Sequence, residues 1–258
     1  MDNKKEYHIL SLSGGKDSTA LAFFMRDNMP EIFEKLELVF YDTGCDLPET
    51  YDYLNKIEIF LGKKITRIRP IYNFEQLFNI YGILPSAMKR WCTVEMKTKT
   101  FRQFIQNKIK SENKIFVYIG IRADESSRVN NSQDNEIIKQ VYPFVEYNII
   151  KKDVCNILDN NGIGFPEYYK WRSRSGCYFC FFQKKIEWLN LKEYHPNLFK
   201  KALEFEEQGN IQRGKKFSWC QDISLKELVK KEDYYRKKYE IKKIKSKNYI
   251  HKNLFEKI

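Results

Sequence analysis

The sequence has no hydrophobic run long enough to span a bilayer, and no apolar stretch of signal-peptide length near its first residues. It therefore predicts a soluble protein of the cytoplasm with no membrane partner. Histidine is scarce: the 3 residues are scattered and suggest no site. Cysteine is limited to 6 residues, and grouped cysteines in reducing cytosol point to metal binding or catalysis rather than to structural disulfides.

Positive charge is concentrated at one end of the chain. The formal net charge is +12, and residues 226–258 contain 12 Lys/Arg against 5 Asp/Glu, a local balance of +7. One interpretation is a solvated charged helix. The other is a surface that contacts the phosphate backbone of a nucleic acid.

Apolar segments of strand length alternate with helical patterns in the first part of the chain. Strands are expected at 8–12, 36–41, 65–68 and 115–119, and helices at 19–28, 48–61 and 98–110. This alternation predicts an α/β fold with a parallel twisted sheet covered by helices on both faces. A soft boundary near residue 145 separates a nucleotide-binding domain, residues 1–145, from a basic, cysteine-containing region, residues 146–258. In that region the sequence predicts helices at 151–160, 184–194, 196–208 and in the lysine-rich end.

The string Ser13-Gly14-Gly15-Lys16-Asp17-Ser18 stands between a predicted strand and a predicted helix. Adjacent glycines let the backbone approach phosphate oxygens, because no Cβ intervenes. The helix offers unpaired N–H groups and a positive dipole end, and Lys16, Ser13 and Ser18 add a charge and two hydroxyls. Asp17 suits a divalent cation between itself and the phosphate. The string differs from Gly-x4-Gly-Lys-Ser/Thr, which cradles β and γ phosphates, and an ordinary glycine turn is the alternative.

This loop is the one found in the ATP pyrophosphatase superfamily, often called the PP-loop. The chain resembles the phosphoadenylyl-sulfate (PAPS) reductase-like branch of that superfamily. The resemblance covers most of residues 8–182 and implies an adenine nucleotide alpha hydrolase-like fold, with ATP across the carboxyl ends of the strands. Besides the loop, the matching segments are Tyr41-Asp42-Thr43-Gly44 with Pro48-Glu49-Thr50, Arg90-Trp91-Cys92-Thr93 with Lys97, Gly120-Ile121-Arg122-Ala123-Asp124-Glu125-Ser126 with Arg128, Tyr142-Pro143, and Gly176-Cys177-x-x-Cys180.

The resemblance also implies roles for individual residues. Asp42 and Thr43 would lie near the adenosine, and Arg122 would face a phosphate or the departing group. Arg122 follows a predicted strand and a glycine, so its guanidinium can reach the pocket and bind an anion through two hydrogen bonds. The alternative is a surface ion-pair cluster, and the roles of Asp124, Glu125 and Arg128 stay open. We expect Lys16, Asp17 and Arg122 to take part in catalysis.

Cys177 and Cys180 have the spacing that lets one loop offer two thiolates to one metal centre. With Cys92 and Cys220 they could form a tetrahedral Zn²⁺ site or hold an iron–sulfur cluster. The resemblance favours a [4Fe-4S] cluster, with Cys220 as the expected fourth ligand, because Cys92 is single where cluster-bearing reductases have a pair. A redox-active dithiol and two buried thiols beneath aromatic residues are the alternatives. Cys45 and Cys155 are expected to be packing residues.

The sulfonucleotide reductases of this branch use a nucleophilic cysteine in a Glu-Cys-Gly tail, which this sequence does not contain. The sequence therefore predicts an enzyme that binds ATP with Mg²⁺, adenylates a second substrate and releases pyrophosphate. A nucleic acid would suit as that substrate, with a sulfur-donor protein as a partner in sulfur transfer. One alternative is a PAPS or adenylyl-sulfate reductase with Cys220 as nucleophile. Another is a nucleic-acid-binding module that senses the nucleotide without turning it over.

Overall fold

The structure, a computed structural model, describes residues 5–109, 113–129, 134–213 and 217–255. The chain divides into two compact units. Unit 1 comprises Met1–Leu77 with Trp91–Cys177, and unit 2 comprises Phe78–Arg90 with Tyr178–Ile258. The predicted boundary near residue 145, between a nucleotide-binding domain and a basic region, stays a prediction.

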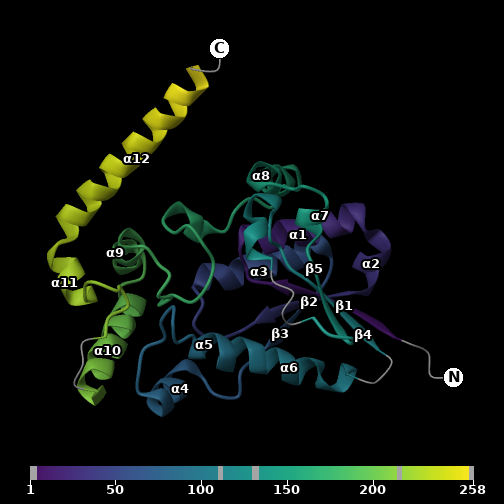
Figure 1. The fold of residues 1–258 in the computed structure, drawn as a ribbon, viewed down its shortest axis with the longest axis horizontal. Helices are drawn as coiled ribbons and strands as arrows, with labels where there is room; N and C mark the ends of the chain where they lie inside the picture. The colour runs from purple at the N-terminus through teal and green to yellow at the C-terminus, as the bar shows by residue number, and fades with distance from the viewer. Residues whose placement is uncertain (1–4, 110–112, 130–133, 214–216, 256–258) are drawn as a thin grey trace. The chain divides into compact units, whose positions relative to one another are not determined.

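Unit 1 contains a five-stranded parallel sheet in the order β3-β2-β1-β4-β5 (Figure 1). The predicted parallel α/β fold is confirmed, and four of these strands lie where the apolar runs predicted them. The edge strand β5 was not predicted, because its sequence Ile-Lys-Gln-Val lacks the continuous apolar run typical of buried parallel strands. The strands are β1 Glu6–Leu12, β2 Leu36–Tyr41, β3 Ile65–Ile68, β4 Lys114–Tyr118 and β5 Ile138–Val141.

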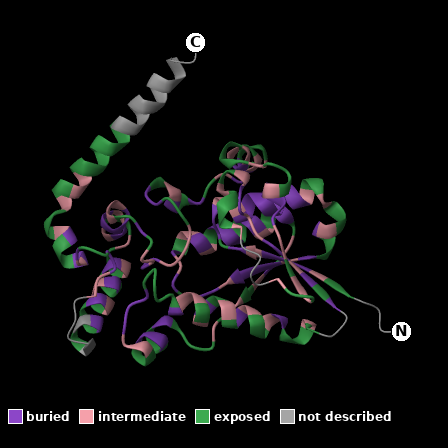
Figure 2. Ribbon diagram, viewed as in Figure 1, coloured by how far each residue is buried: buried purple, intermediate pink, exposed green. Residues whose placement is uncertain are grey.

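Helices cover both faces of the sheet, as Figure 1 shows. On one face, α1 (Lys16–Asn28), α3 (Pro48–Leu61) and α8 (Lys151–Asn160) pack with Leu10 and Leu12 of β1 in the larger core cluster. On the other face, α6 (Lys99–Ile105) packs its Ile105 with Ile9 and Val117. The inner strands β1, β2 and β4 are largely buried, as Figure 2 shows. Alternate residues of β1 thus point to opposite cores, which fixes the register of the central strand.

The helix that leads into α6 is irregular. It begins as α5 (Trp91–Thr93), continues through a π-helical segment at Val94–Thr98 and becomes regular in α6. The Trp91 ring stacks on Phe74 with 5.2 Å between centroids. The predicted helix 98–110 therefore starts earlier and ends in a 3-10 turn at Gln106–Lys108, and its last residue lies outside the described residues. Other short elements are α2 Pro30–Lys35, α4 Phe74–Tyr81, α7 Pro143–Glu146 and 3-10 turns at Ala123–Arg128 and Glu167–Lys170.

Unit 2 is helical in its described part, with α9 Lys185–Tyr194, α10 Pro196–Arg213, α11 Leu225–Lys230 and α12 Glu232–Phe255. The buried Glu206 carboxylate organises the loop between α10 and α11, since it accepts from the backbone N–H groups of Trp219 (2.9 Å) and Leu225 (2.7 Å). The first turns of α12 are tied to α9 by Lys192–Glu232 (2.7 Å) and Arg236–Glu193 (3.0 Å). Residues 237–244 of α12 are exposed (Figure 2).

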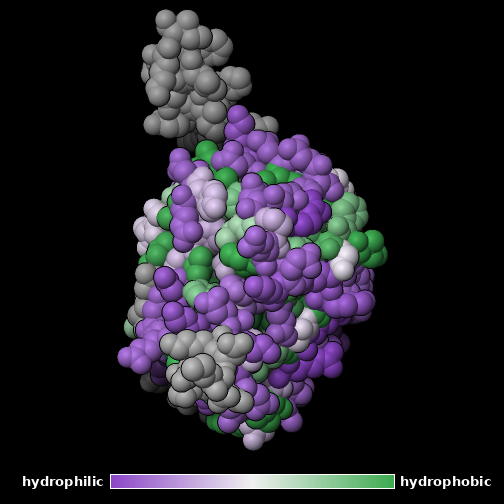
Figure 3. Space-filling model, turned by 90° about the vertical axis from the view of Figure 1, so that its right-hand side faces the viewer, coloured by the Kyte–Doolittle hydropathy of each residue, from purple (hydrophilic) through white to green (hydrophobic). Residues whose placement is uncertain are grey.

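Within the described residues, no helix combines the length and the apolar character that crossing a bilayer requires. The molecular face drawn in Figure 3 is mainly hydrophilic, with hydrophobic residues in small separate groups.

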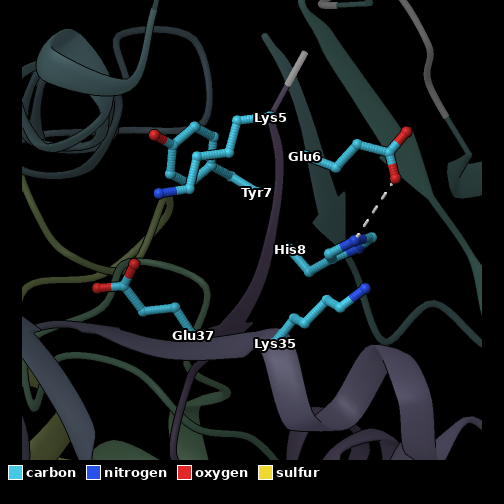
Figure 4. Close-up of a pocket in the computed structure, with 6 residues that line it drawn as sticks. All are labelled: Lys5, Glu6, Tyr7, His8, Lys35 and Glu37. Carbon is cyan, nitrogen blue, oxygen red and sulfur yellow. Dashed lines mark ion pairs between the residues drawn. The ribbon is translucent and has the colours of Figure 1, made fainter. Parts of the chain in front are cut away.

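An open pocket of about 530 Å³ lies at the amino end of the sheet, lined by Lys5, Glu6, Tyr7, His8, Lys35 and Glu37 (Figure 4). Strands β1 and β2 begin there, so the pocket is at the opposite end of β1 from the glycine loop. His8 is buried, stacks on Phe116 and shares a 2.9 Å hydrogen bond between its Nδ1 and the Tyr118 hydroxyl. Burial lowers the pKa of His8 below its usual 6.5, although nearby Glu6 raises it.

This histidine should make stability pH-dependent. Because the pKa of His8 is lower in the folded chain, the unfolded chain binds the proton more readily. Its contribution is complete above pH 6.5, the ordinary pKa, and is lost as pH falls from there toward the lower pKa of the folded state. Urea unfolding between pH 8 and 5 should show a smaller loss of unfolding free energy for His8→Asn than for wild type. Equal losses in the two proteins would contradict this expectation.

Candidate functional site

The glycine loop joins the end of β1 at Leu12 to the start of α1 at Lys16. Gly14 has a φ of +66°, a conformation that side chains disfavour, and a Cβ there would lie 2.6 Å from a methyl group of Thr50. Gly15 has an ordinary φ of −104°, but a Cβ there would lie 2.6 Å from the Ser175 hydroxyl. Gly14 is therefore favoured by its backbone conformation, whereas a larger residue at position 15 would need Ser175 to move.

The two serines of the loop brace its backbone. Ser18 Oγ accepts from the Ser13 N–H (3.1 Å) and donates to the Gly15 carbonyl (3.2 Å), and the two hydroxyls lie 3.1 Å apart. The Gly15 N–H donates to Ser13 Oγ at 3.3 Å. Ser13 and Ser18 hold the loop in shape here, and their predicted role as phosphate donors stays a prediction.

The loop lies at the point where the strand order reverses. The chain passes from β1 through α1 to β2 on one side, whereas β4 pairs with β1 on the other. In open parallel sheets, ligands bind outside the carboxyl ends of the strands at such a point. Gly120, just after β4, packs so closely on α1 that a Cβ would lie 3.0 Å from the Asp17 carbonyl oxygen. The turns after β1 and β4 therefore form one surface.

Arg122 is the centre of a charged cluster on this surface and is only 6% exposed. Its guanidinium contacts the carboxylates of Asp17 (2.7 Å), Asp124 (2.9 Å) and Glu125 (2.6 Å). Burial alone would lower the pKa of Arg122, but hydrogen bonds to Asp124 and Asp17 outweigh it and raise the pKa. Lys16 Nζ lies 2.5 Å from the other oxygen of Asp17. Lys16 and Asp17 of the glycine loop and Arg122 of a second motif thus form a continuous chain of charges.

Asp42, at the end of β2, is buried with its oxygens already engaged. It accepts from the Tyr51 hydroxyl (2.8 Å), Arg69 Nε (2.8 Å) and the Gly44 N–H (3.2 Å). Burial alone would raise the pKa of Asp42, but these hydrogen bonds outweigh it and lower the pKa. Tyr51 and Arg69 could not be predicted as partners of Asp42, because neither belongs to a motif. The predicted contact of Asp42 with adenosine is untested.

Thr43 connects this region to Cys177. Its hydroxyl donates to Asp46 (3.0 Å) and lies 3.6 Å from Cys177 Sγ. Burial raises the pKa of the Asp46 carboxyl, and the charge of Lys97 opposes that shift. Cys45 is buried, as expected of a packing residue, and burial followed by the neighbouring Cys177 raises the pKa of its thiol.

The four predicted metal-ligating cysteines are divided between the units. Cys92 and Cys177 belong to unit 1, and Cys180 and Cys220 to unit 2. Across the described ranges, no group of three or more His, Cys, Asp or Glu side chains is arranged to hold a metal ion. Burial, with Glu206 nearby, raises the pKa of Cys220 to about 12, which disfavours the thiolate that a metal needs. The prediction that Cys220 is the fourth ligand stays a prediction.

Three residues that the sequence analysis did not single out contact the loop. The Tyr168 hydroxyl donates to the Gly14 carbonyl (2.6 Å), the Lys16 N–H donates to the Tyr169 hydroxyl (3.3 Å), and Ser175 Oγ donates to Ser13 Oγ (3.2 Å). The aromatic and arginine-rich composition of this segment is visible in the sequence. Its proximity to a loop more than 150 residues earlier is not.

The chain is similar to a known domain family and to several proteins. The family model described as phosphoadenosine phosphosulfate reductase domain matches residues 7–181. Two uncharacterized proteins of Methanocaldococcus jannaschii are 26% and 27% identical over 254 and 222 residues, which cover 95% and 82% of this chain. The chain spans about half the length of these curated relatives, 56% of one and 45% of the other. An uncharacterized protein of Escherichia phage 186 is 24% identical over 77% of this chain and 74% of its own length.

Two solved structures resemble the chain at low identity. A phosphoadenylyl-sulfate reductase from Candida auris, in complex with phosphate, has a TM-score of 0.49 at 15% identity, covering 68% of this chain and 82% of its own. The U34-tRNA thiolase NcsA from Methanococcus maripaludis, with its [4Fe-4S] cluster, has a TM-score of 0.44 at 15% identity, covering 81% and 74%.

Proposed function

Because this chain belongs to the phosphoadenosine phosphosulfate reductase domain family, we propose that it binds ATP at residues 13–18 and transfers the adenylyl group to a second substrate. The observation that supports this reaction is the convergence of Lys16, Asp17 and Arg122 at the first turn of α1, where the strand order reverses. Backbone N–H groups at a helix start, a lysine and a buried arginine together suit a polyphosphate.

In this reaction an oxygen of the second substrate forms a bond to the α phosphorus. The bond from that phosphorus to the oxygen bridging the α and β phosphates breaks, and pyrophosphate leaves with the electron pair. Lys16 and the start of α1 bind the departing charge, and Arg122 stabilises the charge that develops on the phosphoryl oxygens. Asp17 orients both cations.

The chemistry of Asp17 also fits a Mg²⁺ ion. Its side chain is 27% exposed, and each oxygen, although ion-paired, keeps a further lone pair for a cation. When bound, Mg²⁺ would neutralise phosphate charge.

Nucleic acid is the proposed second substrate, and a sulfur-donor protein the proposed partner in sulfur transfer. The support is the exposed stretch 237–244 of α12, which presents lysines beside Tyr239, Ile241 and Ile244. Pyrophosphate release from ATP is measured with RNA, with DNA and without either. Stimulation by one nucleic acid supports the proposal, whereas nucleotide binding without any release favours a module that senses the nucleotide only.

A reductase is the competing reaction, and the family description favours it. Its candidate nucleophile, Cys220, is buried, and the raised pKa of its thiol works against attack on sulfur. Incubation with PAPS and reduced thioredoxin tests this directly. Sulfite release would replace adenylation with reduction as the function.

We propose a zinc ion or a [4Fe-4S] cluster on Cys177 and Cys180, with Cys92 and Cys220 as further ligands. The spacing of the first two fits two bonds to one centre. Burial of Cys220 disfavours its thiolate in the absence of a metal, and no step of the reaction is assigned to the metal. Anaerobic purification followed by iron, zinc and sulfide analysis should find metal in wild type and in Cys155→Ser, and less in Cys177→Ser. Equal metal content in all three proteins would contradict the assignment.

A further inference from the structure

The segment Glu167–Cys177, termed the strap, links the glycine loop to a cysteine. It starts with a 3-10 turn at Glu167–Lys170 and ends at Cys177. Near its start, Tyr168 and Tyr169 contact Gly14 and Lys16, and near its end Ser175 contacts Ser13. Ser175 packs directly on Gly15, since a Cβ on that glycine would lie 2.6 Å from the Ser175 hydroxyl. The strap therefore covers the surface of the loop that a phosphate would approach.

Tyr169 occupies a hydrogen-bonding position that a phosphate would use. The Lys16 N–H, at the start of α1, has no acceptor within the helix and donates to the Tyr169 hydroxyl instead. The N···O distance of 3.3 Å is long for this type of bond, and the acceptor is neutral. A phosphate oxygen would make a shorter, charge-assisted bond to the same N–H. The N–H cannot serve both acceptors well, so a bound phosphate competes with Tyr169.

The other end of the strap places Cys177. The buried guanidinium of Arg172 donates to the carbonyls of Gly176 (2.9 Å) and Cys177 (2.8 Å). These bonds hold the chain at Cys177 while its Sγ lies 3.6 Å from the Thr43 hydroxyl. The strap between Tyr169 and Cys177 is short and is held together by the hydrogen bonds of Arg172. A displacement at Tyr169 therefore moves Cys177 as well.

We propose that Tyr169 is a positioning residue that couples occupation of the glycine loop to the placement of Cys177. A phosphate that takes the Lys16 N–H displaces the Tyr169 hydroxyl and loosens the strap. The inference rests on the proposed function only in that the loop binds a polyphosphate. Because the hydroxyl competes with the ligand, removing it tightens ligand binding, and because the hydroxyl holds the strap, removing it also loosens the strap without ligand.

The test uses inorganic pyrophosphate as the probe and calorimetry of the full chain. Tyr169→Phe should bind pyrophosphate about 2- to 10-fold more tightly than wild type, the change expected from losing one competing hydrogen bond. Ser175→Ala, which removes the contact with Ser13, should change affinity in the same direction. Tyr147→Phe, at a tyrosine that is 53% exposed and packs on Phe24, is the matched control and should leave affinity unchanged.

Hydrogen–deuterium exchange supplies a second readout that a merely structural role would not produce. Pyrophosphate should increase exchange in peptides covering residues 167–177 of wild type. In Tyr169→Phe, that exchange should already be raised without ligand, and pyrophosphate should add little.

Weaker binding by Tyr169→Phe would mean that the hydroxyl contacts the anion directly, and would overturn the inference. The inference would also be overturned if Tyr169→Phe bound pyrophosphate with wild-type affinity. The same holds if pyrophosphate did not change hydrogen–deuterium exchange of residues 167–177 in the wild-type protein. Pyrophosphate binding without any release of pyrophosphate from ATP would refute only the proposed reaction. A wild-type protein that does not bind pyrophosphate would refute both.

Discussion

Lys16→Met is expected to lower the rate of pyrophosphate release from ATP by about 10²- to 10³-fold, the usual effect of removing one group aimed at developing charge. The lysine side chain is largely buried beside Asp17, so its charge acts in a partly desolvated setting. Methionine keeps most of the aliphatic length, and Arg122 still neutralises Asp17, so the fold should persist. Initial rates at saturating ATP measure the effect.

The control for this experiment is Lys64→Met. Lys64 is 92% exposed and lies 3.5 Å from Glu58, a surface pair worth about 0–1 kcal/mol. Its rate should equal that of wild type. A Lys16→Met protein that keeps its wild-type rate would remove the basis for assigning the reaction to this loop.

Arg122→Met is expected to lower the free energy of unfolding by about 2–3 kcal/mol, below the 3–5 kcal/mol typical of breaking fully buried ion pairs. The arginine is nearly inaccessible, but its three carboxylate partners are 27–40% exposed and regain some hydration. Without Arg122, these negative charges repel one another and also repel the nucleotide. Chemical unfolding and ATP affinity should therefore both decline.

Arg122→Lys should recover only part of the loss, because one ammonium group cannot match a planar guanidinium that contacts three carboxylates. The surface variant Arg67→Met, whose hydrogen bond is to Asn55, should change stability by no more than about 0.5 kcal/mol. If Arg122→Met unfolded at the same denaturant concentration as wild type, the charged cluster would not be a structural element of the site.

The parts of the fold that depend on the pattern of hydrophobic residues could be predicted from the sequence. Strands β1, β2, β3 and β4 are apolar runs followed by turns, and their parallel arrangement follows from the helices between them. The strand β5 was missed because it is a polar edge strand. The helix α4 was missed too, although Asn73 and Gln76 form a capping box at its start.

At the site, local motifs were predictable and distant partners were not. The loop stands directly after β1 and Arg122 lies in the turn after β4, and strands that run parallel bring their carboxyl ends to one edge. Tyr51 and Arg69 reach Asp42, and Tyr168 and Tyr169 reach the loop, only through tertiary packing. One sequence carries no periodic signal for such contacts. Whether the four predicted cysteine ligands meet at one centre also depends on tertiary packing, so this ligand set stays a prediction.

The π-helical segment Val94–Thr98 has a consequence for Cys92. A π turn accommodates one residue more than an α turn, and each residue of a regular helix advances the chain by about 100° around the axis. The side chains of Trp91–Thr93 are therefore rotated about the helix axis relative to where they would lie if α6 were preceded by a regular α-helix. Loss of a single residue between 94 and 98 would therefore re-aim both the tryptophan that stacks on Phe74 and the cysteine beside it.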